Sequence, residues 1–130
     1  MKKALVIKVN NGEVEVNRVP FEHGTLDFYY KEVECECIDI VHGYGLSTDV
    51  DIIVDDEGLF KEKPVLNPLA SVAYGWAEHG QPIVGNAIIC KPHQTKDGID
   101  ETGFEEEELD KVLAEINRKF MEVYHLWISQ

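Results

Sequence analysis

The alternation of apolar and polar residues near the start of the chain predicts a β-hairpin. Residues 3–9 and 13–17 are two runs rich in β-branched residues, and Asn10-Asn11-Gly12 lies between them. Asn-Gly readily adopts the positive φ angles of a tight turn, so we expect the two runs to pair. Val14 and Val16 alternate with polar residues, which predicts one buried and one exposed face for the second strand.

Three further apolar runs predict strands. Residues 37–41 and 50–54 are separated by the glycine-bearing loop His42-Gly43-Tyr44-Gly45, so we expect these two strands to pair. Residues 84–91 form a short apolar run that we expect in the centre of the sheet. The polar segment 92–103 contains the turn residues Asp97-Gly98, and we expect a mobile loop there.

Two segments have the 3.6-residue period of amphipathic helices. The first helix can be capped by Thr25. Its apolar stripe is Leu26, Tyr29, Tyr30 and Val33. The second begins at Thr102, which forms a capping-box pair with Glu105 at the start of the acidic run 105–108. Its apolar stripe is Leu109, Val112, Leu113, Ile116, Phe120, Val123, Tyr124 and Trp127. We expect a long helix over 102–128 that packs on the sheet or on another subunit.

A third helix is predicted by its end signals. Asn67 is a favourable N-cap, and Pro68 suits the first helical position because its ring fixes φ at a helical value. The helix should run from Pro68 to about His79, with Gly80 as the stop. The element order is therefore β-β-α-β-β-α-β-α. This predicts an α+β fold with a mainly antiparallel sheet and helices on one side, in a single domain over residues 1–130.

Composition narrows the environment and the partners. The chain has 12 Lys and Arg against 25 Asp and Glu, a formal net charge of −13, which disfavours direct binding to nucleic acid or to an anionic membrane. No run approaches the roughly 18 apolar residues that cross a bilayer, and Lys8 interrupts the N-terminal apolar run before it could serve as a signal peptide. Three cysteines fit free thiols in a reducing compartment, so we expect a cytoplasmic protein.

No residue pattern identifies an enzyme. Cys35-x-Cys37 with Cys90 and His42 has the residue types of a soft-metal site, but one-residue spacing puts the first two thiols on opposite faces of a strand. The histidines form no i, i+4 helical pair, and the serines lie outside any G-x-S-x-G context. We therefore assign no catalytic residue, metal ligand or cofactor. An enzyme assembled from remote residues stays open as a third hypothesis.

Five acidic residues cluster between positions 49 and 57. Such a density of oxygen ligands can hold a divalent cation, although the spacing matches no EF-hand loop. A solvated strand edge is the commoner outcome of this pattern, and we predict that outcome here. The residues are Asp49, Asp51, Asp55, Asp56 and Glu57.

A candidate anion site lies at the start of the second helix. Lys61-x-Lys63 supplies two cations, and Asn67 marks a helix N-terminus whose backbone N–H groups attract negative charge. Tyr74 and Trp76 offer rings on which a nucleobase can stack. The same pattern also fits a plain helix cap with two solvated lysines, which is the commoner arrangement.

Three segments in the middle of the chain resemble the family called domain of unknown function 3846. They are Val54-Asp55-Asp56-Glu57-Gly58-Leu59-Phe60-Lys61, Pro64-x-x-Asn67-Pro68-Leu69-Ala70 and Ile83-Val84-Gly85-Asn86-Ala87-Ile88-Ile89. With the N-terminal hairpin, the likeness covers roughly residues 3–91, and the C-terminal helix reads as an extension. The resemblance implies a protein of phages, prophages and other mobile elements, with no catalytic residues to carry over.

Two departures from that family touch the candidate site. The family often has Lys-Gly-Leu-Pro where this chain has Lys61-Glu62-Lys63-Pro64, and an acidic residue is common where Asn86 stands. We include Asn86 among the predicted ligand-binding residues, because a site at the Gly85-Asn86 turn would have different details here.

Two functions follow as hypotheses. The first is a non-enzymatic mobile-element protein that binds and sequesters a nucleotide-like signal of host defence, using Lys61, Lys63, Asn67, Tyr74 or Trp76, and Asn86. We also expect a homo-oligomer, because such pockets often form between subunits and the stripe ending at Trp127 can supply an interface. The second is an acidic inhibitor that imitates DNA and blocks a nucleic-acid enzyme of the host.

Overall fold

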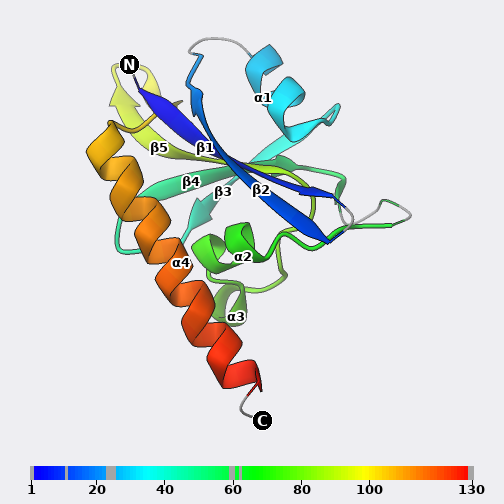
Figure 1. Ribbon diagram of the computed structural model, residues 1–130. Coiled ribbons are helices and arrows are strands. Elements are labelled where there is room, and N and C mark those ends of the chain that lie inside the picture. Colours follow the sequence, from blue (N-terminus) through cyan, green and yellow to red (C-terminus); the bar gives the residue numbers. More distant parts are fainter. Residues whose placement is uncertain (1, 11, 23–25, 59–60, 62, 129–130) are drawn as a thin grey trace.

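The computed structural model describes residues 2–10, 12–22, 26–58, 61 and 63–128, without the side chains of residues 79 and 124–128. Within these described residues, the chain forms six strands and four helices (Figure 1). Their bounds are β1 (Lys3–Asn10), β2 (Glu13–Pro20), α1 (Leu26–Val33), β3 (Ile38–Gly43), β4 (Val50–Asp55), α2 (Pro68–Tyr74), α3 (Trp76–His79), β5 (Ala87–Thr95), β6 (Gly98–Thr102) and α4 (Glu106–Ile128).

The strands form one antiparallel sheet in the order β2-β1-β5-β4-β3, with β6 paired to β5. The predicted hairpin is confirmed: Asn10 pairs with Glu13, and Gly12 has a φ of 85°. The predicted pairing of the two middle strands is also confirmed by the β3–β4 ladder. β5 occupies the centre, as its apolar run predicted, since it pairs with β1 on one side and β4 on the other.

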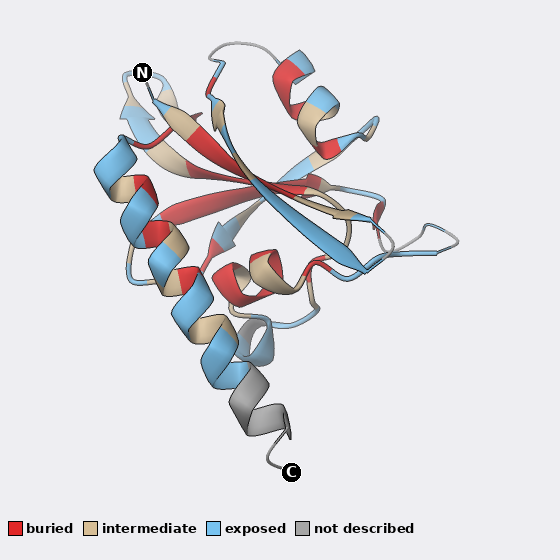
Figure 2. Ribbon diagram, in the orientation of Figure 1, coloured by how far each residue is buried: buried red, intermediate tan, exposed pale blue. Residues whose placement is uncertain are grey.

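Both faces of the sheet carry helices, which confirms the α+β antiparallel class but corrects the expectation of helices on one side. One core joins the sheet to α2 and α4 through buried residues such as Leu5, Ile52 and Leu109. A second core on the opposite face joins Val6 and Ile88 to α1. Figures 1 and 2 show α1 on one side of the sheet and α2 and α4 on the other, with buried residues concentrated between these layers. The two cores arise because central strands such as β1 and β5 bury both of their faces.

The edge strand β2 does not have the buried face predicted from its alternation. Val14 is 40% exposed and Val16 is 36% exposed. Val19, nearer the end of the strand, packs at the margin of the core beneath α1. An edge strand can keep an alternating pattern even where little of the protein covers it, so the pattern overstated the burial here.

The helix predicted from Pro68 to His79 is divided at Gly75. Its start is confirmed, because Asn67 caps α2 and Pro68 occupies the first turn. Gly75 adopts the left-handed conformation at φ 83°, and its N–H bonds to the carbonyls of Ser71 and Val72. A residue in this conformation ends the helical ladder, so α3 starts as a separate short helix at Trp76.

The segment predicted as a mobile loop, 92–103, mostly forms the end of β5 and all of β6. Thr95 pairs with Gly98, so the predicted turn at Asp97-Gly98 is confirmed as the link of a hairpin. Thr102 is a buried strand residue opposite Lys91, and this ladder keeps it out of the helix. The predicted capping box is therefore wrong: α4 starts at Glu106, and the Glu108 carboxylate accepts from the N–H of Glu105.

The remaining end signals of the helices lie partly outside the described residues. Thr25, the predicted cap of α1, belongs to a segment that is not described. The stripe of α4 is confirmed for its first half, where Leu109, Val112 and Ile116 are buried. No helix of the described chain is long and apolar enough to cross a membrane.

Candidate functional site

A hollow of about 170 Å³ forms where the end of α1, the segment before α2 and the start of β5 meet. We call it the lysine pocket. It brings together three of the predicted ligand-binding residues, Lys61, Lys63 and Asn86. Its lining residues are Val9, Val33, Glu34, Asp55, Gly58, Lys61, Lys63, Pro64, Val65, Gly85 and Asn86.

Lys61 is ion-paired at the edge of this pocket. Its Nζ lies 2.7 Å from Oδ2 of Asp55, whose side chain is only 6% exposed, whereas the lysine side chain is 55% exposed. The hydrogen bond to the Asp55 carboxylate raises the pKa of Lys61 above its ordinary value. The lysine therefore stays charged at neutral pH, but an incoming anion has to compete with Asp55 for it.

Asn86 holds the opposite wall together. Its Oδ1 accepts from the N–H of Val9 at 2.9 Å, and its Nδ2 donates to the Val33 carbonyl at 3.3 Å and to Oε2 of Glu34 at 3.0 Å. These bonds connect β1, the end of α1 and the start of β5. The side chain uses both its acceptor and its donor group in structural contacts, so its role at the pocket is to position the wall.

Glu34 of this wall and its ion-pair partner Lys8, which lies outside the lining, gave no local signal in the sequence. Glu34 has a positive φ of 62° at the end of α1, which is uncommon for a residue with a side chain. Lys8 of β1 lies 3.5 Å from the Glu34 carboxylate and 3.9 Å from that of Glu32. The charges around the lysine pocket thus alternate between ammonium and carboxylate groups.

Asn67, also predicted to bind a ligand, does not line the lysine pocket. The side chain is fully buried. Its Oδ1 accepts from the N–H of Ala70, and its Nδ2 donates to the carbonyls of Ile7 at 3.1 Å and Gly85 at 2.9 Å. The amide that caps α2 also binds the sheet, so the same feature that made it a good cap keeps it away from any ligand.

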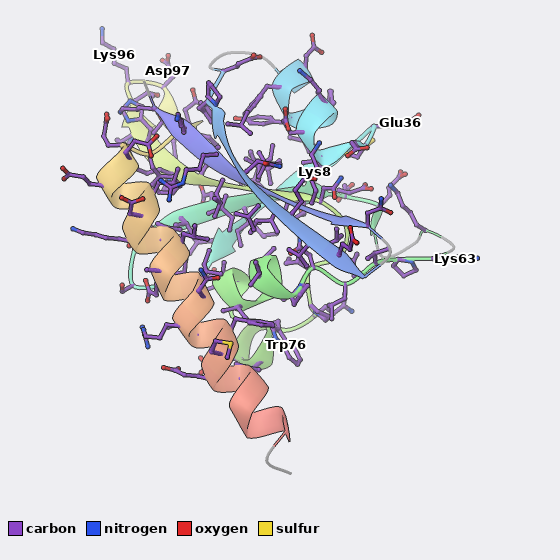
Figure 3. All side chains as sticks on the ribbon, in the orientation of Figure 1. Lys8, Glu36, Lys63, Trp76, Lys96 and Asp97 are labelled. Atoms are coloured by element: carbon purple, nitrogen blue, oxygen red, sulfur yellow. The ribbon has the colours of Figure 1, made fainter. Side chains whose placement is uncertain are left out.

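Tyr74 and Trp76 are also separated from the lysines. Tyr74 lines a different hollow, and Trp76 lines two hollows against α4. Figure 3 shows Trp76 beside the short helix α3, whereas Lys63 extends from a distant loop. Neither ring is placed to stack on a base held at Lys61. The break at Gly75 contributes to this result, because the prediction had assumed one continuous helix.

The hollow lined by Tyr74 is the larger one, at about 350 Å³. We call it the acidic hollow, because three carboxylates line it together with apolar side chains. Its lining residues are Asp39, Val41, Val54, Asp55, Asp56, Tyr74, Gln81, Pro82, Ile83 and Val84. Asp55 belongs to this hollow and to the lysine pocket. Within the described residues, Asp39 and Asp56 have no ion-pair partner.

Titratable side chains from β3, β4, β5 and β6 contact one another in a row, which we call the chain from His42. Nε2 of His42 lies 3.2 Å from Asp49 and its Nδ1 lies 3.1 Å from Asp51. Burial, followed by a hydrogen bond with Asp51, raises the pKa of Glu101 to about 8. The thiol of Cys90 donates to Oε1 of Glu101 at 3.4 Å. Burial raises the pKa of this thiol well above its ordinary value, so Cys90 is not an activated nucleophile.

The other thiols are no better placed for chemistry. Cys35 is half-buried, Cys37 is exposed, and burial raises the pKa of Cys35. In the part of the chain that the structure describes, no three His, Cys, Asp or Glu residues are arranged to hold a metal ion. Four of the acidic residues at 49–57 are divided between the chain from His42 (Asp49 and Asp51), the Lys61 ion pair (Asp55) and the acidic hollow (Asp55 and Asp56).

Comparison with known proteins gives one match. The family model described as Domain of unknown function (DUF3846) matches residues 1–117. The match extends into α4, beyond the range of roughly 3–91 expected from the motifs, so much of this helix belongs to the matched region. No curated protein and no solved structure matches the chain.

Proposed function

The chain belongs to the family called domain of unknown function 3846, and from this membership we propose a phage or mobile-element protein that binds and sequesters a nucleotide-like signal of host defence without cleaving it. One observation carries the proposal. The segments that the sequence shares with the family, 54–61, 64–70 and 83–89, converge on the lysine pocket and supply most of its lining. A ligand site at this point would give these three segments a shared role.

The chemistry of the pocket suits a phosphate group better than a base. Lys61 and Lys63 supply ammonium groups, and a phosphate would take Lys61 from Asp55. Small-molecule sites usually enclose about 300–1,000 Å³. The lysine pocket, at about 170 Å³, is smaller. We therefore propose that a second copy of the chain covers the rest of the ligand, in a homo-oligomer.

Native mass spectrometry tests both parts of this proposal. The protein, purified from infected or nucleotide-rich bacterial lysate, would be weighed before and after denaturation to obtain the subunit number and any retained small molecule. We expect a nucleotide-sized adduct that is released intact. Recovery of a cleaved product would contradict sequestration, and a ligand-free mass from lysate that contains the signal would contradict binding.

Variants locate the site. We expect Lys61→Ala and Lys63→Ala each to weaken retention by about tenfold, since each removes a charge-assisted contact to phosphate. Lys96→Ala is the matched control, because Lys96 is an exposed lysine in the β5–β6 turn, far from Lys63 (Figure 3). Trp76→Ala should leave retention unchanged, since Trp76 lies outside the pocket. Equal losses in all four variants would remove the support for the lysine pocket.

The second candidate function is an acidic inhibitor that binds a nucleic-acid enzyme of the host. A specific observation favours it: cationic side chains partly neutralise the acidic start of α4, whereas, among the described residues, they do not neutralise Asp39 of β3 or Asp56, which follows β4. Glu106 pairs with Lys3 and Arg18, and Glu108 pairs with Lys91, but Asp39 and Asp56 have no ion-pair partner in the described part of the chain. Steep weakening of partner binding with added salt would support this candidate. Binding that does not change with salt would exclude it.

A further inference from the structure

The strand β3 ends the sheet with a free edge. Within the described chain it pairs with β4 and with no other strand. The N–H of Asp56 donates to the carbonyl of Cys37 at 3.0 Å, so these two residues form a hydrogen-bonded pair of the antiparallel ladder. Hydrogen-bonded and non-hydrogen-bonded pairs alternate along such a ladder. By this alternation the backbone N–H and C=O groups of Ile38, Ile40 and His42 point away from β4. These groups form a row to which another strand can bond.

A single side chain occupies part of this row. The N–H of Ile40 donates to Oδ1 of the neighbouring Asp39 at 2.9 Å. Further along, the edge is covered, because the N–H of Tyr44 bonds to the carbonyl of Tyr74 and that of Gly45 to the carbonyl of Ala73. The free part of the edge is therefore limited to β3 itself.

The acidic hollow lies beside this edge. Asp39 and Val41 of β3 line it, with Asp56 and Tyr74 across from them and Ile83 among its apolar walls. Carboxylates above apolar walls suit a long basic side chain, because the aliphatic stem of lysine or arginine packs on the walls while its charged end meets the carboxylates. A side chain of an added strand, on the same face as Asp39 and Val41, would lie next to this hollow.

We propose that β3 binds an extended segment of a partner protein that carries basic side chains at alternate positions. The segment adds a strand to the sheet, and its carbonyl replaces Asp39 at the N–H of Ile40. The released Asp39 carboxylate then pairs with a basic side chain in the acidic hollow. A second copy of β3 does not meet the requirement, because Ile38–Gly43 contains no lysine or arginine to enter the acidic hollow. This docking surface goes beyond phosphate binding, although it shares Asp55 with the lysine pocket.

Fluorescence anisotropy with a labelled peptide that alternates lysine and threonine tests the proposal. We expect Asp39→Asn and Asp56→Asn each to weaken binding roughly fivefold, the upper range for one partly exposed ion pair. Asp97→Asn, in the exposed β5–β6 turn, changes the net charge equally and should leave binding almost unchanged. An equal effect of all three substitutions would show attraction to overall charge only and would overturn the proposal.

Backbone pairing needs its own test. A version of the peptide with alternate N-methylated amides keeps every lysine but cannot form the ladder, and we expect it to lose at least tenfold in affinity. Ile40→Pro removes an edge N–H that is not bonded to β4, and Ile40→Ala controls for the side chain. If the N-methylated peptide binds as tightly as the parent, the proposal is wrong, whether or not Ile40→Pro folds. Dimerisation through β3 in sedimentation experiments would also overturn it, since a second copy would then occupy the edge.

Discussion

The Cys90 thiol donates a hydrogen bond to Oε1 of Glu101 at 3.4 Å, and both side chains are buried. Because Asp51 also shares a hydrogen bond with Glu101, two carboxyl groups and a thiol lie close together where burial makes negative charge costly. Keeping Glu101 protonated is the least costly way to satisfy them. The cluster therefore ties the β5–β6 hairpin to β4 through a neutral carboxyl group rather than through an ion pair.

Replacing Glu101 should change how stability depends on pH. In the folded protein the pKa of Glu101 is raised to about 8, against an ordinary value of 4.5. Between these values the folded state holds a proton that the unfolded chain releases, so this group's contribution to the free energy of unfolding falls as pH rises. Glu101→Gln has no titratable carboxyl group at this position. We expect the stability of the variant relative to the wild type to rise by roughly 4 kcal/mol from the lower to the upper end of that window.

Urea unfolding followed by circular dichroism across that window measures the effect. The quantity of interest is the difference between variant and wild type at each pH, because other carboxylates such as Glu106 and Glu108, whose pKa values are lowered by their lysine and arginine partners, contribute equally to both proteins. Asp97→Asn, in the exposed β5–β6 turn, controls for the loss of one carboxyl group. A parallel curve for Glu101→Gln would mean that Glu101 is ionised in the folded state.

Asn67 should be among the least replaceable polar residues. Asn67→Ala removes the cap of α2 and leaves the buried carbonyls of Ile7 and Gly85 without their donor, so we expect a loss of about 3 kcal/mol in the free energy of unfolding. Asn67→Asp keeps the cap acceptor but directs negative charge at these carbonyls, and should cost at least as much. Denaturant titration decides, with the exposed Asn117→Ala on α4 expected to stay within about 0.5 kcal/mol.

Gly45 and Gly12 differ in the space available for the methyl group that a substitution by alanine would add. A Cβ at Gly45 would lie 2.0 Å from the carbonyl oxygen of Val72, so Gly45→Ala must separate the end of β3 from α2. A Cβ at Gly12 meets nothing within 4 Å, and only its φ of +85° opposes it. We expect roughly 1 kcal/mol of destabilisation for Gly12→Ala and more than about 3 kcal/mol for Gly45→Ala. Similar unfolding midpoints for the two variants would contradict this close contact.

The three thiols should react with a disulfide reagent at separate rates. Exposed Cys37 should react first, half-buried Cys35 more slowly, and buried Cys90 only after unfolding, because burial and the adjacent Glu101 raise the pKa of its thiol well above its ordinary value. The time course of reagent release in buffer and in urea measures this. Cys37→Ser should remove the fastest phase. Rapid reaction of Cys90 in the folded protein would show that the Glu101 cluster opens readily.

The sequence predicted the elements whose signals are local. Asn-Gly predicted the first turn, Asn67-Pro68 predicted the start of α2, and the apolar run before Lys91 predicted the central strand. Signals that depend on distant partners were misread. Thr102 resembles a helix cap, but it belongs to β6 because Lys91 pairs with it. Gly75 fits a helix interior by sequence, and only its observed left-handed conformation shows that the helix ends there.

In the candidate site, too, the sequence predicted the residues with local signals and not the contacts between distant ones. Lys61 and Lys63 were visible as a local pair of cations, and the pocket contains both. Their neutralising partner Asp55 and the contact between Asn86 and Glu34 depend on tertiary structure. The rings of Tyr74 and Trp76 were assigned by proximity in sequence, but Tyr74 at the end of α2 and Trp76 at the start of α3 line other hollows.

Asp55 lines both the lysine pocket and the acidic hollow, so binding at the two proposed surfaces would be thermodynamically linked. A phosphate that draws Lys61 away leaves the charge of Asp55 free to attract a cation on its other side. A cation bound beside Asp55 weakens the attraction of Asp55 for Lys61, so a phosphate takes Lys61 more easily. By reciprocity each ligand would raise the affinity of the other by the same factor, so a sequestered signal and a basic partner would act as mutual positive effectors. Asp55→Asn would uncouple them.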